Sequence, residues 1–478
     1  MTIVETLGKF TADTAFADLP ANVVEETKRI LLDSIGCALA ALDDDKGKIG
    51  IDMGMRMGGS SAEAVVLGTG RRTSVMGAAF ANAELINALD MDAVLPPGHV
   101  APYVIPAALA LAELNRGSGA DLLTALAIAH EMSWRVGKSM DYLRDVKDGV
   151  VTPPRVFGYS STLFGATAAV LKVGGAEAAT ISHGIGIAAY CMPVNAQMAW
   201  VMHAPASTVK YGPTGPLVQM ALNSAMYAEG GHRGDLDVLD DAEYGFPAMI
   251  GTKRWATETI TDQLGEAWRF PTQSTFKPYP YCRVLHTAFD VMGRMQDEHD
   301  LRPDEIERIH VQGEGMLEKP IWENTTIERA VDAQFSIKHG IALAAHRVKP
   351  GKAWQDPSLV YSDSVMGLME RTSHEAHPEA GTAMLKHPSS RPTRVEIHAR
   401  GTVFTGEQLF PKGSPSPDPA SHMTNDELVA KFLHNGADVL TPAALDEAAD
   451  RIMTLESQAD VAKVMAVFVD GMQKRAAA

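Results

Sequence analysis

Apolar residues recur at helical spacing through the first half of the chain. In residues 19–42, LPANVVEETKRILLDSIGCALAAL, they follow the i, i+3, i+4, i+7 pattern of an amphipathic helix. Similar runs, many of them rich in Ala and Gly, follow at 74–90, 101–114, 119–137, 161–174, 176–191 and 212–230. Because small side chains let helices approach closely, this half of the chain predicts a layered, all-α domain.

The pattern changes near residue 270. Polar and apolar residues alternate in IERIHVQGEG (306–315) and in TRVEIHARGTVFTGE (393–407), and both runs predict β-structure. Helical runs lie between them at 335–346 and 362–371, and a Pro/Ser/Gly-rich connector at 411–424 leads into a helical tail. We therefore predict a mostly α protein. Residues 1–268 and 411–478 form a large all-helical domain, and residues 269–410 form a smaller inserted α+β unit.

The length and composition indicate a globular protein with two domains. A chain of 478 residues is too long for one ordinary core, and 46% hydrophobic and 21% charged residues are normal globular values. The 59 acidic and 42 basic residues give a formal net charge of −17, which disfavours non-specific binding to nucleic acids and anionic membranes. An acidic chain that binds an anion must therefore concentrate positive side chains locally.

Neither the N-terminus nor the cysteines indicate export or a metal site. The first residues, MTIVETLGKFTADTAF, lack the basic start and apolar stretch of a signal peptide. No window approaches the roughly 18 uncharged apolar residues of a membrane span. Cys37, Cys191 and Cys282 are scattered and form no Cys-x-x-Cys pair, so we expect neither a disulfide framework nor structural zinc. We expect a cytoplasmic protein with no membrane or nucleic-acid partner.

A first group of candidate catalytic residues lies where an apolar helix gives way to a Pro/Gly loop, in ALDMDAVLPPGHVAP (88–102). Asp90, Asp92 and His99 at such a junction can form a hydrogen-bonded acid–base group that faces a cleft. The same side chains would also suit a solvated turn followed by an ordinary loop histidine. The spacing leaves both interpretations open.

Lys210 is a candidate for binding an anion. It precedes a helix predicted to begin near Thr214, where the ammonium and the helix dipole would together favour a carboxylate. An ordinary surface lysine is the alternative.

A second cationic cluster lies in FKPYPYCRVLHTAFD (276–290). Lys277, Cys282, Arg283 and His286 fall within ten residues there, on a backbone stiffened by two prolines. Such a group suits anion binding and proton transfer. A domain linker with capping residues is the alternative interpretation.

His339 stands before a glycine in the apolar run FSIKHGIALAAHR (335–347). A histidine on such a face is either a hydrogen-bonded core residue or a catalytic group. The Gly-rich segments at Gly68 and Gly184 lack the context of nucleotide-binding loops, and neither a Gly-x-Ser-x-Gly nor a His-Glu-x-x-His motif is present.

In order and spacing these segments resemble the MmgE/PrpD family, which includes 2-methylcitrate dehydratase, cis-aconitate decarboxylase and iminodisuccinate epimerase. The resemblance covers nearly the whole chain. It is carried by LPANVVEETKRILLDSIGCALAAL, FANAELINALDMDA with the following GHVAPYVIPAALALAE, AHEMSWRVG, FKPYPYCRVLHTAFD, VDAQFSIKHGIA and PKGSPSPDPASHMTNDELVAKF.

The resemblance implies that residues 269–410 are a lid domain, that the active site lies between the two domains without metal or organic cofactor, and that the protein is a homodimer. Position by position, Asp90 matches the family's first active-site aspartate and His99 the histidine that follows it. Lys210 matches the lysine of a Thr-Lys segment, and Lys277 matches that of a Lys-Pro-Tyr-Pro loop.

Three positions depart from the family pattern. Ala93 stands where the second acid of an Asp-Asp pair is usual, and Val156 stands where a catalytic histidine is often found. His339 replaces the tyrosine of a Phe-Ser-x-x-Tyr segment. Because these changes redistribute the groups that move protons, they favour a different carboxylate, or a proton shift in place of an elimination.

The chemistry that these enzymes share is proton transfer next to a carboxylate. We predict a cofactor-independent lyase, a dehydratase or decarboxylase, that acts on a small di- or tricarboxylate. Lys210 and Lys277 would hold the substrate carboxylates and the enolate-like charge, since such a centre needs fixed cations. His99 would act as general acid and base, with Asp90 as its partner.

Further side chains complete this predicted site. His339 or Tyr159 would donate a proton from the opposite face of the substrate. Four neighbouring residues are expected to bind substrate: Asp92, Cys282, Arg283 and His286.

Three alternatives stay open. An epimerase would use the same enolate-like intermediate, and a non-catalytic member of the family would bind a carboxylate without turnover. The 16 histidines and many acids of the chain are compatible with a metal-dependent hydro-lyase, although their spacing matches no metal motif.

Overall fold

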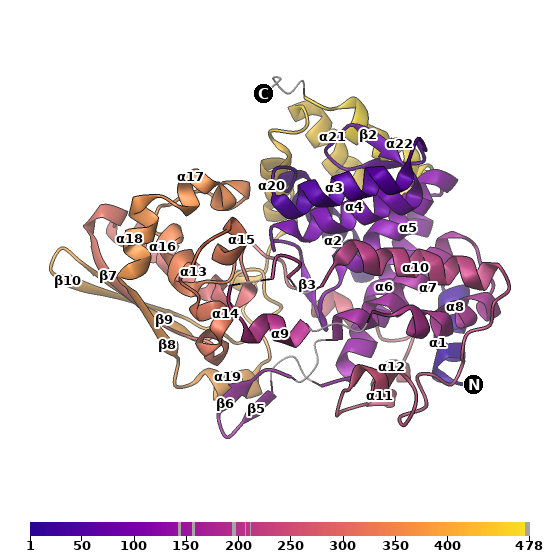
Figure 1. Cartoon of the computed structure of the whole chain (residues 1–478), viewed down its shortest axis with the longest axis horizontal. Coiled ribbons are helices and arrows are strands. Elements are labelled where there is room, and N and C mark those ends of the chain that lie inside the picture. Colours follow the sequence, from indigo (N-terminus) through magenta and orange to yellow (C-terminus); the bar gives the residue numbers. More distant parts are fainter. Residues whose placement is uncertain (142–144, 155–157, 194–196, 206, 211, 474–478) are drawn as a thin grey trace.

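The computed structural model describes residues 1–141, 145–154, 158–193, 197–205, 207–210 and 212–473. It is mostly α, as predicted, with 57% of the chain in helices and 10% in strands. No helix in these ranges combines the length and apolar character needed to cross a membrane. Helices and strands are unevenly distributed between two halves that lie side by side in Figure 1.

The larger half, on the right of Figure 1, is a layered stack of helices drawn from both ends of the chain. Its N-terminal helices are α1 (Ile3–Asp13), α2 (Ala21–Ala40), α3 (Asp45–Gly58), α4 (Val75–Ala88), α5 (Ala101–Asn115), α6 (Gly119–Ser139), α7 (Thr162–Val173), α8 (Ala178–Cys191), α10 (Thr214–Glu229), α11 (Phe246–Ile250) and α12 (Thr257–Thr261). The C-terminal helices are α20 (Asn425–Gly436), α21 (Pro442–Met453) and α22 (Val461–Asp470). Helices α20 and α21 pack on α2, so the two ends of the chain share one core.

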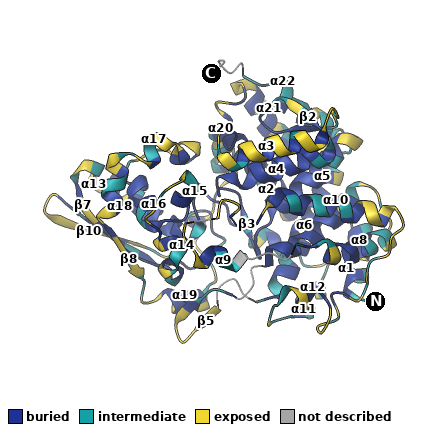
Figure 2. Ribbon diagram, in the orientation of Figure 1, coloured by how far each residue is buried: buried dark blue, intermediate teal, exposed yellow. Residues whose placement is uncertain are grey.

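Local chemistry explains where these helices begin and how closely they pack. Ser74 caps α4 by accepting the backbone N–H of Gly77, and Thr424 with Glu427 forms a capping box at α20. Each such cap stabilises a helix by about 1 kcal/mol. A Cβ on Gly54 of α3 would lie 2.4 Å from the carbonyl oxygen of Gly77, so only glycine allows α3 and α4 to approach this closely. Figure 2 shows the result: α4 is buried, whereas α3 exposes its outer face.

The smaller half contains a four-stranded sheet with helices packed on it. The strands are β7 (Ile306–Gly313), β8 (Thr372–Ala376), β9 (Thr393–Ala399) and β10 (Thr402–Gln408), in the order β10-β9-β7-β8. Only the β7–β8 pair is parallel. The helices are α13 (His286–His299), α14 (Pro320–Glu323), α15 (Ala330–Ala333), α16 (Ile337–Ala344), α17 (Pro357–Val360), α18 (Asp363–Glu370) and α19 (Ala380–Lys386). Buried and partly exposed residues alternate along β9, as its sequence predicts.

The segment 393–407 is a hairpin of two strands rather than one continuous strand. Arg400 and Gly401 both have positive φ, 55° and 67°, and turn the chain between β9 and β10. Two central residues with positive φ are typical of the tight turns whose twist matches that of paired strands. Polar and apolar residues alternate on both sides of this turn, so the sequence pattern alone suggests a single strand.

Several short elements connect the two halves. The hairpin β5 (Asp145–Lys147) and β6 (Val150–Thr152) packs on α19, and α9 (Gln197–Met202) packs on α14. Both segments fall outside residues 269–410, which are predicted to form a lid and are called the lid below, yet they contact that range. A further hairpin, β3 (Val94–Leu95) and β4 (Gly98–His99), pairs with the start of the lid through two backbone hydrogen bonds of 2.8 Å between Val94 and Thr275. Strands β1 (Ala64–Val66) and β2 (Arg71–Thr73) form a separate pair beside α4.

Candidate active site

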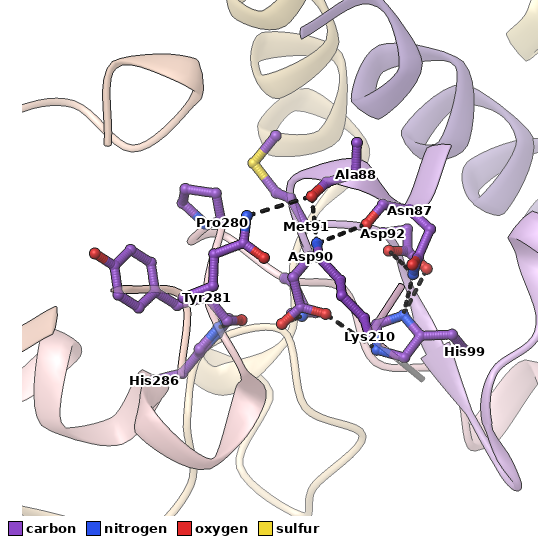
Figure 3. A network of polar contacts seen from close by, with 12 residues as sticks. Asn87, Ala88, Asp90, Met91, Asp92, His99, Lys210, Pro280, Tyr281 and His286 are labelled. Atoms are coloured by element: carbon purple, nitrogen blue, oxygen red, sulfur yellow. Dashed lines mark hydrogen bonds and ion pairs between the residues drawn. The ribbon is translucent and has the colours of Figure 1, made fainter. Parts of the chain in front are cut away.

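The candidate site is centred on the loop that joins α4 to α5. Helix α4 ends at Ala88, and Asp90 follows with a positive φ of 53°. This left-handed conformation disfavours an L-residue by roughly 1 kcal/mol, and such strain is concentrated at functional sites. The β3–β4 hairpin then returns the chain, so that His99 lies against the two aspartates (Figure 3). Asp90, Asp92 and His99 are all buried.

His99 lies between two carboxylates. Its Nδ1 is 2.7 Å from Oδ2 of Asp92, and its Nε2 is 3.3 Å from Oδ1 of Asp90. Because an ionised carboxylate only accepts hydrogen bonds, Nδ1 carries a proton and donates it to Asp92. This fixes the tautomer and leaves Nε2 as the position where a proton can be gained or lost, the arrangement that orients a catalytic histidine in other enzymes.

Lys277 reaches this cluster from the lid. Its Nζ is 2.9 Å from Oδ2 of Asp90, and both side chains are fully buried. Burial alone would raise the pKa of Asp90, but the ammonium of Lys277, with His99 and Lys210, outweighs it and holds that pKa below its ordinary value. The result is a continuous chain of groups, Asp92–His99–Asp90–Lys277, that crosses from the helical half to the lid.

Lys210 lies beside the same loop, but not as the sequence predicts. Its Nζ donates to the carbonyl oxygens of Asn87, at 3.1 Å, and Ala88 at the C-terminal end of α4, where the helix dipole favours a cation. The N-terminus of α10, expected to bind a substrate anion, already holds a carboxylate: the N–H of Gly215 donates to Glu84 at 2.7 Å. Lys210 thus contacts the C-terminal end of α4, whereas the N-terminus of α10 contacts Glu84.

The environment of Lys210 makes it a candidate for proton transfer as well as for anion binding. Burial lowers its pKa to about 8, despite the nearby Asp90. Its backbone, like that of Asp90, has a positive φ of 53°. The ammonium therefore lies close to its deprotonation point near neutral pH.

Tyr159 packs beside His99. The two ring centroids are 6.2 Å apart, and Tyr159 is buried. Gly98 makes this approach possible, because a Cβ at that position would lie 1.9 Å from the tyrosine ring. Val156, the predicted replacement for a catalytic histidine, lies outside the described residues. Ala93 is buried next to Asp92.

The other predicted residues of the lid have mixed environments. Cys282 lies near Asp90 and Lys277, and burial and the Asp90 charge raise the pKa of its thiol. Burial and Lys277 lower the pKa of His286 well below its ordinary value, and its Nε2 donates to the carbonyl of Tyr281 at 2.9 Å. Both side chains therefore stay neutral near pH 7.

Arg283 and His339 are directed elsewhere. Arg283 donates to Ser414 at 2.6 Å. His339 is fully buried, with Nε2 2.9 Å from the carbonyl oxygen of Val360 and Nδ1 3.1 Å from the hydroxyl of Tyr281. Burial lowers the pKa of His339 to about 4. These bonds make it a hydrogen-bonded residue of the lid core rather than a member of the Asp92–His99–Asp90–Lys277 chain.

The structure adds residues that the sequence analysis missed. Asn87 donates to Oδ1 of Asp92 at 3.3 Å and accepts a hydrogen bond from Lys46 at 2.8 Å. Asn87 lies in the last turn of α4, directly before the loop that carries the two acids, and this position was the available signal. Gln334, near the middle of the 269–410 segment, donates to the carbonyl of Ala88 at 3.3 Å, and no local pattern marks it.

The aspartates and His99 are also the one group of potential metal ligands in the described part of the chain. One ligand atom from each lies within 4.8 Å of the others. However, the Lys277 ammonium already contacts Asp90, and it would repel a divalent cation. The geometry therefore favours an acid–base cluster that binds through its lysines.

A cavity of about 450 Å³ opens between the two halves beside this cluster. It lies between the start of α3 and the lid segments around 328–331 and 352–361, with Lys210 and Lys46 in its wall. Asp90, His99 and Lys277 do not line it. Lys210 therefore lines this cavity together with three acids, Asp43, Asp44 and Asp45, whereas His99 does not.

Two family models match this chain, one after the other. The MmgE/PrpD N-terminal domain matches residues 5–258 and the MmgE/PrpD C-terminal domain matches residues 279–456. A cis-aconitate decarboxylase-like protein, oryM, of Aspergillus oryzae is 26% identical over 483 aligned residues, which cover 95% of this chain and 94% of that protein. A cis-aconitate decarboxylase of Aspergillus terreus is 25% identical over 319 residues, covering 62% of this chain and 61% of that protein. The chain therefore belongs to the MmgE/PrpD family.

Proposed function

We propose that this protein is a lyase that acts on a small di- or tricarboxylate by moving a proton next to a carboxylate, without a cofactor. The observation that carries the proposal is the buried chain Asp92–His99–Asp90–Lys277. The family and the names of the fungal relatives support a decarboxylase or a dehydratase. Cis-aconitate is therefore the first substrate to test.

His99 is the general acid and base of this proposal. Asp92 holds the proton on Nδ1, so Nε2 exchanges a proton with the substrate. The neighbouring Asp90 stabilises the imidazolium that forms when Nε2 gains a proton. Tyr159, packed beside the imidazole, is the candidate donor on a second side of the substrate.

The two lysines bind the substrate charge. A substrate carboxylate competes with Asp90 for the ammonium of Lys277, since both are anions that seek the same buried cation. Lys210, in the wall of the cavity, binds a second carboxylate. An enolate-like centre between them is stabilised by both cations in a site that excludes water.

Both lyase reactions balance with these groups. In a decarboxylation, the bond to one carboxylate breaks, carbon dioxide leaves, and the electron pair spreads towards a remaining carboxylate until a proton from His99 or Tyr159 arrives at carbon. In a dehydration, His99 removes the proton next to a carboxylate, and the β-hydroxyl takes a proton from Tyr159 and leaves as water.

Proton NMR in deuterium oxide tests the proposal. The purified protein is incubated with cis-aconitate, 2-methylcitrate and citrate, each with and without EDTA. Conversion that persists in EDTA is expected. His99→Gln should abolish it, whereas His130→Leu, which alters a buried histidine of α6, should retain it.

The other outcomes of this experiment would each contradict the proposal. Exchange of a carbon-bound proton with inverted configuration and no elimination would identify an epimerase. Saturable binding without any product would identify a carboxylate-binding protein. Loss of activity in EDTA, restored by a divalent metal, would refute a cofactor-independent reaction.

A further inference from the structure

A second buried charge pair lies next to the loop that carries the candidate site. It joins α2, near the N-terminus, to α20, near the C-terminus: Nζ of Lys431 is 2.6 Å from Oδ1 of Asp33. Asp33 is fully buried and only 9% of the Lys431 side chain is exposed. The proposed reaction uses neither residue.

The pair contacts the backbone of the catalytic loop. Nζ of Lys431 donates to the carbonyl oxygen of Met91 at 2.9 Å. Met91 stands between Asp90 and Asp92, and this carbonyl belongs to the peptide unit that joins Met91 to Asp92. The N–H of Ala93 also stabilises the carboxylate of Asp33, on the next turn of the loop.

Other bonds hold the loop at its two ends. Lys210 binds the carbonyls of Asn87 and Ala88, and Val94 pairs with Thr275. Between these anchors, the contact from Lys431 fixes the part of the loop that carries the acids. Because Asp90 already has a positive φ, rotation of the Met91 peptide would turn both carboxylates relative to His99.

We propose that Lys431, held by Asp33, is a positioning residue that fixes the Met91 carbonyl and thereby aligns Asp90 and Asp92 on the two nitrogens of His99. This proposal rests on the proposed function, since it concerns the same acid–base cluster. The α20 helix follows the connector that leaves the lid, so the C-terminal segment completes the active site as well as the core.

The charge state of the pair suits this role. Burial would lower the pKa of Lys431, but the carboxylate of Asp33 outweighs it and raises that pKa. The ammonium therefore persists, and it can donate to Asp33 and Met91 together. A neutral side chain such as methionine fills the same space and cannot hold the carbonyl.

The chain contains a matched control for this pair. Lys28, also on α2, donates to the carbonyl of Met453 at 2.9 Å and to Glu456 at 3.0 Å. Its side chain is 8% exposed. The two lysines thus have similar burial, and each bonds a backbone carbonyl, but Lys28 bonds the end of α21 instead of the catalytic loop. Its carboxylate partners, Glu25 and Glu456, are partly exposed, whereas Asp33 is fully buried.

The test compares three variants of the full-length protein with the wild type. Lys431→Met leaves Asp33 as an unpaired buried charge and is destabilised for that reason alone. The double variant Asp33→Asn with Lys431→Met removes both charges at nearly constant volume and isolates the loss of the Met91 contact. Lys28→Met is the control. Each protein is measured for Tm, for kcat and KM on the substrate found above, and for hydrogen exchange in residues 89–95.

The double variant should keep a Tm near that of the wild type and lose kcat by about 10²-fold with little change in KM, because displacement of a catalytic group by about 1 Å has that effect. Exchange in residues 89–95 should become faster. Lys28→Met should lower Tm while kcat and the exchange of this segment stay unchanged.

Two results would overturn the proposal. One is a double variant with wild-type kcat and unchanged exchange in residues 89–95, and the other is an equal loss of kcat in Lys28→Met. If the wild type converts no carboxylate at all, the proposed function fails first. The exchange measurement then still decides whether Lys431 orders the loop, because unchanged exchange in the double variant refutes it.

Discussion

Replacing Asp92 with asparagine removes one negative charge and preserves the shape of the side chain. In the wild type, Asn87 donates to Oδ1 of Asp92, and His99 donates to Oδ2. In the variant, the amide oxygen at position 92 remains opposite the amide group of Asn87, since that group can only donate there. The new NH₂ group then faces Nδ1 of His99. It forces Nδ1 to accept, and the imidazole proton moves to Nε2.

The expected loss of activity follows from two effects. The 2.7 Å contact to an ionised, buried partner is a charge-assisted hydrogen bond that contributes about 1.5–3 kcal/mol. At 1.36 kcal/mol per factor of ten, its loss lowers kcat by roughly 10- to 10²-fold. The reversed tautomer adds to this loss, and the same change in a Ser-His-Asp triad lowers kcat by about 10⁴-fold. We therefore expect Asp92→Asn to lower kcat by between about 10-fold and about 10⁴-fold, with KM nearly unchanged.

Steady-state kinetics and the deuterium-exchange assay measure this effect. Glu113→Gln is the matched control, because Glu113 is another buried carboxylate of the helical half with two polar partners, Val65 and Arg72. It should change stability but not kcat. A loss of less than about threefold in Asp92→Asn, with normal folding, would mean that His99 is not the catalytic base and would refute the assignment.

Three further predictions concern pH and packing. The pKa of Lys210 is about 8 in the fold and 10.5 in the unfolded chain, so kcat/KM should fall as pH rises through 8, and Lys210→Met should remove this pH dependence. Because the unfolded chain then binds more protons than the fold, the free energy of unfolding of the wild type should rise by about 3 kcal/mol relative to Lys210→Met between pH 8 and 10.5, as measured by chemical denaturation. Burial lowers the pKa of His130 to about 4, so its contribution to stability is present above pH 6.5 and is lost as pH falls towards 4. Over this range the Tm of His130→Leu should therefore fall less than the Tm of the wild type, and an identical pH dependence of the two Tm values would contradict the assignment. Gly98→Ala places a Cβ 1.9 Å from the ring of Tyr159 and should lower kcat at least tenfold with a folded circular-dichroism spectrum, whereas wild-type kinetics would show that the ring can move away freely.

The sequence predicts the helices well because their periodicity is a local property. The runs at 74–90 and 101–114 correspond to α4 and α5, and the acids and histidine at the end of the first run are the ones that meet in the site. Three residues within ten positions of one another, separated by a Pro/Gly turn, are brought together by a hairpin. The cluster of Asp90, Asp92 and His99 can therefore form mainly through contacts between residues that are close in sequence.

The remaining partners cannot be found in this way. Lys431 is 340 positions from Met91, and Lys277 reaches Asp90 only because Val94 pairs with Thr275 at the start of the lid. No periodicity encodes such contacts. The orientation of Lys210 also depends on tertiary structure, since Glu84 of α4 occupies the helix terminus that the local pattern assigns to a substrate.

The charges of the site also indicate how binding prepares the reaction. In the free protein, Lys277 is the strongest influence that offsets the burial of Asp90 and keeps it ionised. A substrate carboxylate that pairs with this ammonium leaves Asp90 buried with less positive charge around it. The proton affinity of the Asp90–His99 pair then rises, because a buried carboxylate with less positive charge around it holds a proton more tightly. We therefore expect substrate binding to be accompanied by proton uptake, visible as a buffer-dependent enthalpy in calorimetry. Such uptake delivers an acid to the site at the moment when a carbanion-like centre needs one.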